Sequence, residues 1–168
     1  MNFLIDVMKQ LNILEKADQN GHPDAPALLG SLIEKKKVLD LQKTQKEIID
    51  LYKKSCSLGS YEGMYHLATH YHYGIGVEKN IKEAIRLYNL VSKNQNYNKN
   101  KTSAVFSLSK LYEENKDYKN AFKLADHFRL KEKFVGYLLC SDFLNRGVGV
   151  EVNQELANEY LEAASQDK

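Results

Sequence analysis

Apolar residues recur at helical spacing along most of the chain. In residues 61–73 these positions are Met64, Leu67, Ala68 and Tyr71. Their spacing of i, i+3, i+4 and i+7 is that of one face of an α-helix. Similar stretches follow one another, separated by glycines or polar runs. The pattern predicts an all-α chain with helices over roughly residues 3–19, 25–36, 44–57, 61–73, 81–93, 102–114, 118–130, 133–145 and 154–166.

The chain also repeats itself. A shift of 73 residues superposes residues 63–92 on residues 136–165, taking Gly76 to Gly149 and Ala84 to Ala157. That shift is two units of roughly 36–37 residues, a length typical of helical-hairpin repeats. A related unit lies between them, and an earlier one precedes them. We therefore predict repeats at residues 25–59, 63–95, 104–130 and 136–165, behind a capping helix over residues 1–20.

Each repeat is expected to be a helix, a turn and a second helix. Gly74 and Gly76 should end the first helix, because glycine readily takes the positive φ that such turns require. Asn80 is a predicted N-cap of the second helix, with Glu83 as its capping-box partner. The small side chain of Ala84 should let the two helices approach closely.

The two ends of the chain differ from the middle. The first helix has no partner within a repeat and presents an apolar side, formed by Leu4, Val7, Met8, Leu11 and Leu14. In the last helix, Ala157, Leu161 and Ala164 should face inward, with glutamates outside, as terminal repeats require. Both ends look finished, so we expect a complete protein. The predicted fold is a right-handed α-solenoid that forms one domain over residues 1–168.

The repeat resembles the Sel1-like repeat, a relative of the tetratricopeptide repeat. Residues 63–92 match its pattern through Leu67, Tyr71, Gly74, Gly76, Val77, Ala84 and Tyr88. Residues 136–165 match through Gly147, Gly149, Val150, Ala157 and Ala164. Residues 25–59 match more weakly, and residues 104–129 look more like a tetratricopeptide hairpin. For function, the resemblance implies an adaptor or scaffold role in protein–protein interaction.

Composition and charge exclude several classes of protein. Among 168 residues, 43% are apolar and the net charge is +2, as in ordinary globular proteins rather than nucleic-acid binders. No run of about 18 apolar residues could span a membrane, and Asp6 and Lys9 interrupt any signal peptide. Cys56 and Cys140 lack the spacing of metal ligands, so we expect free thiols in the cytoplasm.

One polar cluster needs a chemical interpretation. Glu62, His66 and His70 are four residues apart, so they share a helix face, and two such histidines can bind one metal ion. The same pattern fits a hydrophilic helix face or a pH-sensitive contact with a partner. No further ligand and no catalytic motif accompanies the cluster, so we predict no cofactor and no enzyme activity.

The expected binding surface is the concave side of the solenoid, which first helices line. In the repeat starting at residue 63, positions that the packing pattern leaves unused hold Glu62, Tyr65, His66, Thr69, His70 and Tyr73. In the last repeat the equivalent candidates include Leu139, Asp142 and Arg146. Tyrosine combines an apolar ring with a polar tip, which suits protein recognition.

The sequence therefore predicts a protein–protein interaction module that binds one dedicated partner as an adaptor or scaffold. The alternative is an inhibitor, such as an immunity protein that occludes the active site of a toxin or enzyme. Neither nucleic acid nor membrane is expected as a partner, and the oligomeric state stays open.

Overall fold

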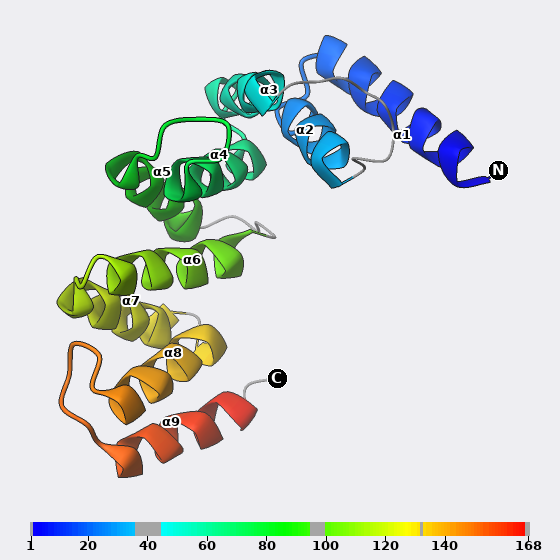
Figure 1. Ribbon diagram of the computed structural model, residues 1–168. Helices are drawn as coiled ribbons and strands as arrows, with labels where there is room; N and C mark the ends of the chain where they lie inside the picture. Colours follow the sequence, from blue (N-terminus) through cyan, green and yellow to red (C-terminus); the bar gives the residue numbers. More distant parts are fainter. Residues whose placement is uncertain (1, 36–44, 95–99, 132, 167–168) are drawn as a thin grey trace. The chain divides into compact units, whose positions relative to one another are not determined.

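The computed structural model describes residues 2–35, 45–94, 100–131 and 133–166, and these residues form helices joined by short turns (Figure 1). The helices are α1 (Asn2–Gln19), α2 (Ala25–Lys35), α3 (Gln45–Ser57), α4 (Tyr61–Tyr73), α5 (Ile81–Lys93), α6 (Lys101–Glu114), α7 (Tyr118–Lys131), α8 (Lys133–Arg146) and α9 (Gln154–Gln166). The predicted helices are confirmed to within one residue at each end. The predicted ends at residues 36 and 44 lie outside the described residues.

The chain divides into two compact units, residues 1–101 and residues 102–168. The first unit holds α1 to α5, and the second holds α7 to α9 with all of α6 except its first residue. Each unit is described by itself below. The single domain over residues 1–168 stays a prediction.

Local signals in the sequence set the ends of α4 and α5. The Ser60 side chain accepts a hydrogen bond from the Gly63 N–H at 3.0 Å and so caps α4. Asn80 caps α5 by accepting from the Glu83 N–H at 3.0 Å, as predicted. The capping-box role of Glu83 is wrong, because its carboxylate binds Arg86 instead and the Asn80 N–H donates to the backbone of the preceding helix.

In the first unit, α2 packs against both α3 and α4. Tyr52 of α3 is fully buried there, and a Cβ added to Gly30 of α2 would lie 3.0 Å from the Tyr52 ring. The absence of a side chain at Gly30 therefore lets α2 approach the ring closely, since a Cβ there would require the ring to shift.

Helix α1 covers α2 with only part of its apolar side. Val7 and Leu11 are buried as predicted, but Met8 is 60% exposed, so its predicted inward position is wrong. Met8 stands next to Val7 in sequence, and one residue turns a helix by about 100°. The side chain of Leu4 lies outside the described residues.

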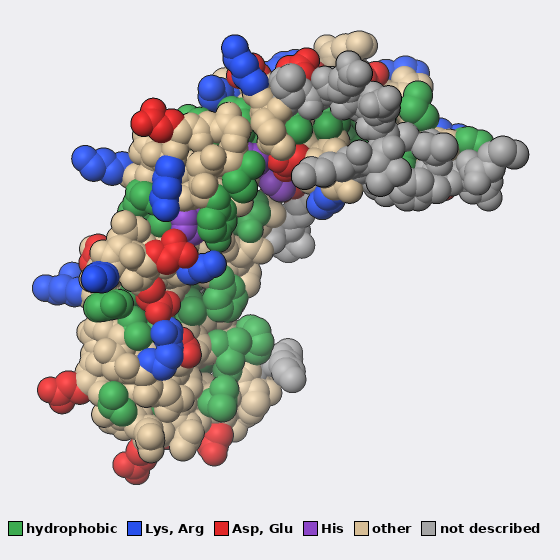
Figure 2. Space-filling model, viewed as in Figure 1, with side chains coloured by type: hydrophobic (Ala, Val, Ile, Leu, Met, Phe, Trp, Pro, Cys, Tyr) green, Lys and Arg blue, Asp and Glu red, His purple; other side chains and the backbone are tan. Residues whose placement is uncertain are grey.

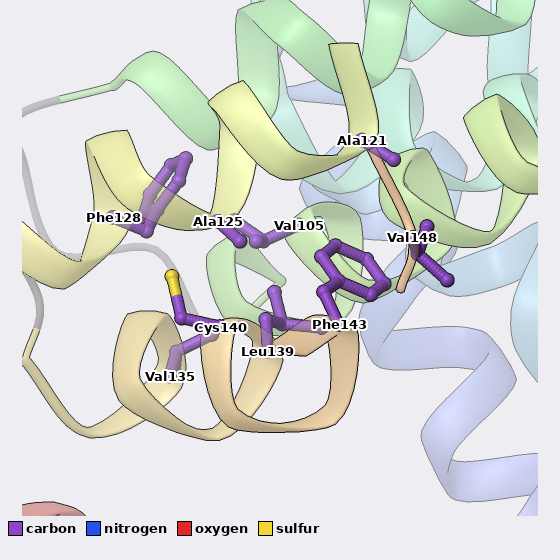
Figure 3. Packing of buried hydrophobic residues seen from close by; sticks show 9 residues of the cluster. All are labelled: Val105, Ala121, Ala125, Phe128, Val135, Leu139, Cys140, Phe143 and Val148. Carbon is purple, nitrogen blue, oxygen red and sulfur yellow. The ribbon is translucent and has the colours of Figure 1, made fainter. Parts of the chain in front are cut away.

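The second unit has a core in which α6, α7 and α8 meet (Figure 3). Val105 of α6, Ala125 of α7 and Phe143 of α8 are buried together in it. Helix α9 packs against α8 through buried Ala157 and Ala164, as predicted. Leu161 is 52% exposed, so its predicted inward position is wrong.

The predicted glycine turns are confirmed in both Sel1-like segments. Gly76 and Gly149 have φ of +67° and +70°, which side chains resist. A Cβ at Gly149 would also overlap with the carbonyl oxygen of Tyr118. Among the described residues, no helix combines the length and the apolar character needed to cross a bilayer.

We expect Gly149→Ala to destabilise the second unit more than Gly21→Ala destabilises the first. Both glycines have positive φ, so each alanine should cost about 1–2 kcal/mol in backbone strain. Only Gly149 also lies against backbone, so its replacement should cost about 1–3 kcal/mol more through overpacking, whereas nothing lies within 4 Å of a Cβ at Gly21. Urea unfolding of the two variants measures the difference. Equal losses would show that the close approach at Gly149 is wrong.

Candidate functional site

A half-buried carboxylate from α2 and a buried histidine from α4 form a pair in the first unit. The Glu34 Oε1 atom lies 3.0 Å from the His70 Nε2 atom, and His70 is 4% exposed. The Tyr52 hydroxyl of α3 donates to the other Glu34 oxygen at 2.7 Å. Three successive helices thus meet at one carboxylate.

The hydrogen bonds of His70 indicate that its ring is charged. Its Nδ1 atom lies 2.8 Å from the carbonyl oxygen of Ile75, which can only accept, so Nδ1 carries hydrogen. The Nε2 atom faces the Glu34 carboxylate and donates to it only when the ring is protonated. A protonated His70 satisfies both contacts at once.

The pKa values of the two groups move in the directions that a charged pair requires. Burial opposes the charge on His70, but its hydrogen bonds to Glu34 and Ile75 outweigh burial and raise its pKa above the ordinary value. Burial would raise the pKa of Glu34, but hydrogen bonds from His70 and Tyr52 lower it below the ordinary value.

Two further predicted site residues lie beside this pair. His66 stacks on Tyr52 with ring centroids 4.9 Å apart, and its Nε2 atom is 3.3 Å from a Glu62 oxygen. Glu62 is only 8% exposed and accepts a hydrogen bond from the Asn100 side chain at 2.6 Å. The expectation that packing leaves positions 62 and 70 unused is therefore wrong. In Figure 2 only small purple areas of histidine reach the surface that it shows.

The other candidates on α4 are more accessible. Tyr73 is 49% exposed, and its ring stacks on buried His72 with centroids 4.2 Å apart. Tyr65 is half-buried between His66 and Tyr88, at centroid distances of 5.6 and 6.0 Å. We define the aromatic face as Tyr65, Thr69 and Tyr73, which follow one another at four-residue spacing along α4.

A metal ion at Glu62, His66 and His70 has no support in this geometry. Both ring nitrogens of His70 face groups other than Glu62 and His66. Within the ranges that the structure describes, no three His, Cys, Asp or Glu side chains are grouped to hold a metal ion.

The candidates in the second unit separate into core and surface. Leu139 is 7% exposed and points into the cluster that Figure 3 shows, so it belongs to the core. Arg146 and Asp142 are exposed and bind each other, and Arg146 Nη1 also donates to Glu113 Oε2 at 2.9 Å. Arg146 and Glu113 border a polar pocket of about 300 Å³, which Tyr118 also lines.

Sequence reasoning missed Glu34 and Tyr52, the two residues that give the α4 histidines their roles. A tyrosine and a carboxylate 18 residues apart carry no periodic signal that would join them to His70.

Comparisons with known proteins identify the repeat. The Sel1 repeat family matches residues 62–96 and 137–167, which hold most of α4 with α5 and most of α8 with α9. These two segments of the chain are Sel1-like repeats. The first matched repeat carries the aromatic face, and the second carries Asp142 and Arg146.

Solved structures agree with this assignment. A Sel1 repeat protein from Oxalobacter formigenes aligns with a TM-score of 0.70 and 23% identity, over 98% of this chain and 69% of that chain. A protective antigen present in uropathogenic Escherichia coli strains, which displays an SLR fold, aligns with a TM-score of 0.71 and 22% identity. That alignment covers 93% of this chain and 33% of the antigen.

At these identities the likeness shows the fold alone, which is an all-α solenoid. No curated protein sequence matches the chain. The right-handed sense and the further repeats at residues 25–59 and 104–130 stay predictions.

We expect the Glu34–His70 pair to stabilise the first unit in a pH-dependent way. Folding raises the pKa of His70. Its contribution to the free energy of unfolding is therefore complete at pH values below its pKa in the unfolded chain, about 6.5, and is lost as pH rises through its pKa in the folded protein. Folding lowers the pKa of Glu34. Its contribution to the free energy of unfolding is therefore present above about pH 4.5 and is lost as pH falls through its pKa in the folded protein.

Accordingly, Glu34→Gln should cost about 1.5–3 kcal/mol of unfolding free energy near pH 6 and clearly less near pH 9. Urea unfolding at both pH values measures the change. Glu15, which is exposed on α1, provides the control. Glu15→Gln should change the free energy of unfolding little at either pH. If Glu34→Gln costs the same at both values, His70 is not the charged partner.

Proposed function

We propose that the chain is a non-enzymatic adaptor that binds one protein partner through the aromatic face of α4. Sel1 repeat proteins are typically protein–protein interaction modules. The observation that carries the proposal is the combination of exposure and restraint at Tyr73, which is 49% exposed yet stacked on the buried ring of His72. A side chain that is already held in place loses less conformational freedom on binding.

The rest of the aromatic face is held in the same manner. The Thr69 hydroxyl donates to the Tyr65 carbonyl oxygen at 3.0 Å and lies 3.1 Å from the Tyr88 hydroxyl. The Tyr65 ring packs against the rings of His66 and Tyr88. Tyrosine is enriched among the residues that dominate binding energy at protein interfaces, which supports a recognition role for this surface.

In this proposal the buried polar residues position the aromatic face rather than touch the partner. Glu62 and His70 hold α4 against its neighbours, and His66 supports Tyr65. We propose Asp142 and Arg146 as a separate polar contact on the second unit, whereas Leu139 packs in the core.

The cysteines support a non-enzymatic role in a reducing compartment, and we propose a cytoplasmic location. Cys56 and Cys140 are free thiols. Burial raises the pKa of Cys56 to about 11 and that of Cys140 to about 12, so both stay protonated and poorly nucleophilic at neutral pH.

Photo-crosslinking tests the adaptor proposal directly. A photoreactive phenylalanine analogue in place of Tyr73 should capture a single major protein in the source cell, identified by mass spectrometry. The same analogue at Lys53, which is exposed on α3, serves as the control and should not capture it. Equal capture from both positions would contradict a binding surface on α4. If the captured protein is a toxin or enzyme that this chain inactivates, the inhibitor alternative replaces the adaptor.

With that protein purified, Tyr73→Ala or Tyr65→Ala should weaken its binding by about tenfold or more, as expected for central aromatic anchors. Lys53→Ala and Lys123→Ala remove exposed side chains from second helices and should change affinity little. Isothermal titration calorimetry gives the affinities, and circular dichroism checks that helix content is unchanged. Loss of affinity with the lysine variants alone would place the binding surface elsewhere.

A further inference from the structure

An apolar groove of about 330 Å³ lies between α1 and α2 in the first unit. Its lining includes Ile13 and Leu14 of α1, Leu28 and Leu32 of α2, and the charged residue Lys35 at the end of α2. Ile13 is 66% exposed. None of these residues belongs to the aromatic face.

The groove has an equivalent elsewhere in the same unit. The turn before α2 and the turn before α4 make matching backbone hydrogen bonds, from Gly21 to Asp18 and from Gly59 to Cys56, at 2.9 and 3.0 Å. Both glycines have positive φ, at +76° and +84°. A shift of 38 residues, which takes Gly21 to Gly59, therefore superposes α1 and α2 on α3 and α4.

This shift reveals what covers the equivalent surface. It takes Leu32 to His70, whose ring binds Glu34 of α2 at 3.0 Å. It takes Leu14 to Tyr52, whose ring lies against Gly30 of α2. The part of the α3–α4 surface around Tyr52 and His70 is thus covered by α2, the preceding first helix.

We propose that the groove between α1 and α2 binds an amphipathic helix of a partner protein, which packs there as α2 packs on α3 and α4. The occupant needs a small residue facing Leu14, as Gly30 faces Tyr52. It needs an apolar residue where α2 has Glu34, because the groove presents Leu32 in place of His70. Lys35 favours an acidic residue at the adjacent end of that helix.

Shape and charge favour a partner helix over a second copy of the same groove. Two concave apolar surfaces cannot fill each other, whereas a single helix can fill one. In a symmetric contact the same surface of both copies meets, so Lys35 would face the residues around a second Lys35. Such a contact brings no acidic group from the groove lining to pair with Lys35. The binding mode is that of a helix in a groove, read by residues at i, i+3, i+4 and i+7.

A synthetic peptide based on α2 tests this proposal with the full chain. The probe is a fluorescent, N-acetylated peptide of residues 24–35 carrying Glu34→Leu and Lys35→Glu, which supplies the apolar and acidic groups that the groove requires. The control peptide carries Gly30→Leu in addition. Because a helix this short is marginal in water, a hydrocarbon staple on its outer side keeps both peptides helical.

Fluorescence anisotropy should show that the probe binds the unmodified chain. The probe should bind the Ile13→Glu variant about tenfold more weakly, and the Gly30→Leu peptide should bind the unmodified chain about tenfold more weakly. Met8→Glu is the matched control, since Met8 is 60% exposed on α1 but does not line the groove, and it should leave affinity unchanged. Leu28→Gln replaces Ile13→Glu if circular dichroism shows that the latter misfolds.

Three results would overturn the proposal. The first is no binding of the probe at about 1 mM, the upper range of weak specific affinity. The second is equal binding to the unmodified chain and Ile13→Glu. The third is a homodimer in light scattering that Ile13→Glu converts to a monomer, which would make a second copy the occupant.

Discussion

The first unit depends on a partly buried ion pair between two packed helices. Glu34 and His70 lie 3.0 Å apart, and Tyr52 donates to the same carboxylate from the helix between them. Removing charge from water is costly, and further hydrogen bonds from Tyr52 to Glu34 and between His70 and Ile75 offset part of that cost. Removing one partner would leave an uncompensated charge, so the pair fixes how α2 sits against α4 more strictly than apolar contact would.

The same repeat position serves two different purposes in this unit. At α4 the position is His70 and the neighbouring helix is present, so a specific polar contact defines the interface. At α2 it is Leu32, which lines an apolar groove. An apolar position adapts to many occupants, whereas a buried ion pair accepts only a partner that completes it. The α2–α4 interface is thus specific for one partner helix, whereas the groove between α1 and α2 can accept a wider range of helices.

Sequence patterns sufficed for the helices because helix ends depend on nearby residues. Asn80 caps its helix, and Gly74, Gly76 and Gly149 take positive φ through local geometry that each sequence motif already specifies. The same reasoning failed for Met8 and Leu161, whose helical spacing fits an apolar face although the neighbouring helix covers only part of it. Spacing gives the direction of a side chain, but burial also depends on how far the next helix extends.

The candidate site was less predictable, because its polar residues gain their roles from partners distant in sequence. Glu62 and His70 look like a solvated helix face until Asn100 and Glu34 are placed beside them. Leu139 likewise occupies a first-helix position, yet it meets Val105 and Ala125 in the core. Titratable side chains at the candidate positions of α4 are thus committed to holding helices together. The α4 candidates that remain partly accessible are Tyr65, Thr69 and Tyr73. An aromatic ring with a polar tip suits recognition of another protein.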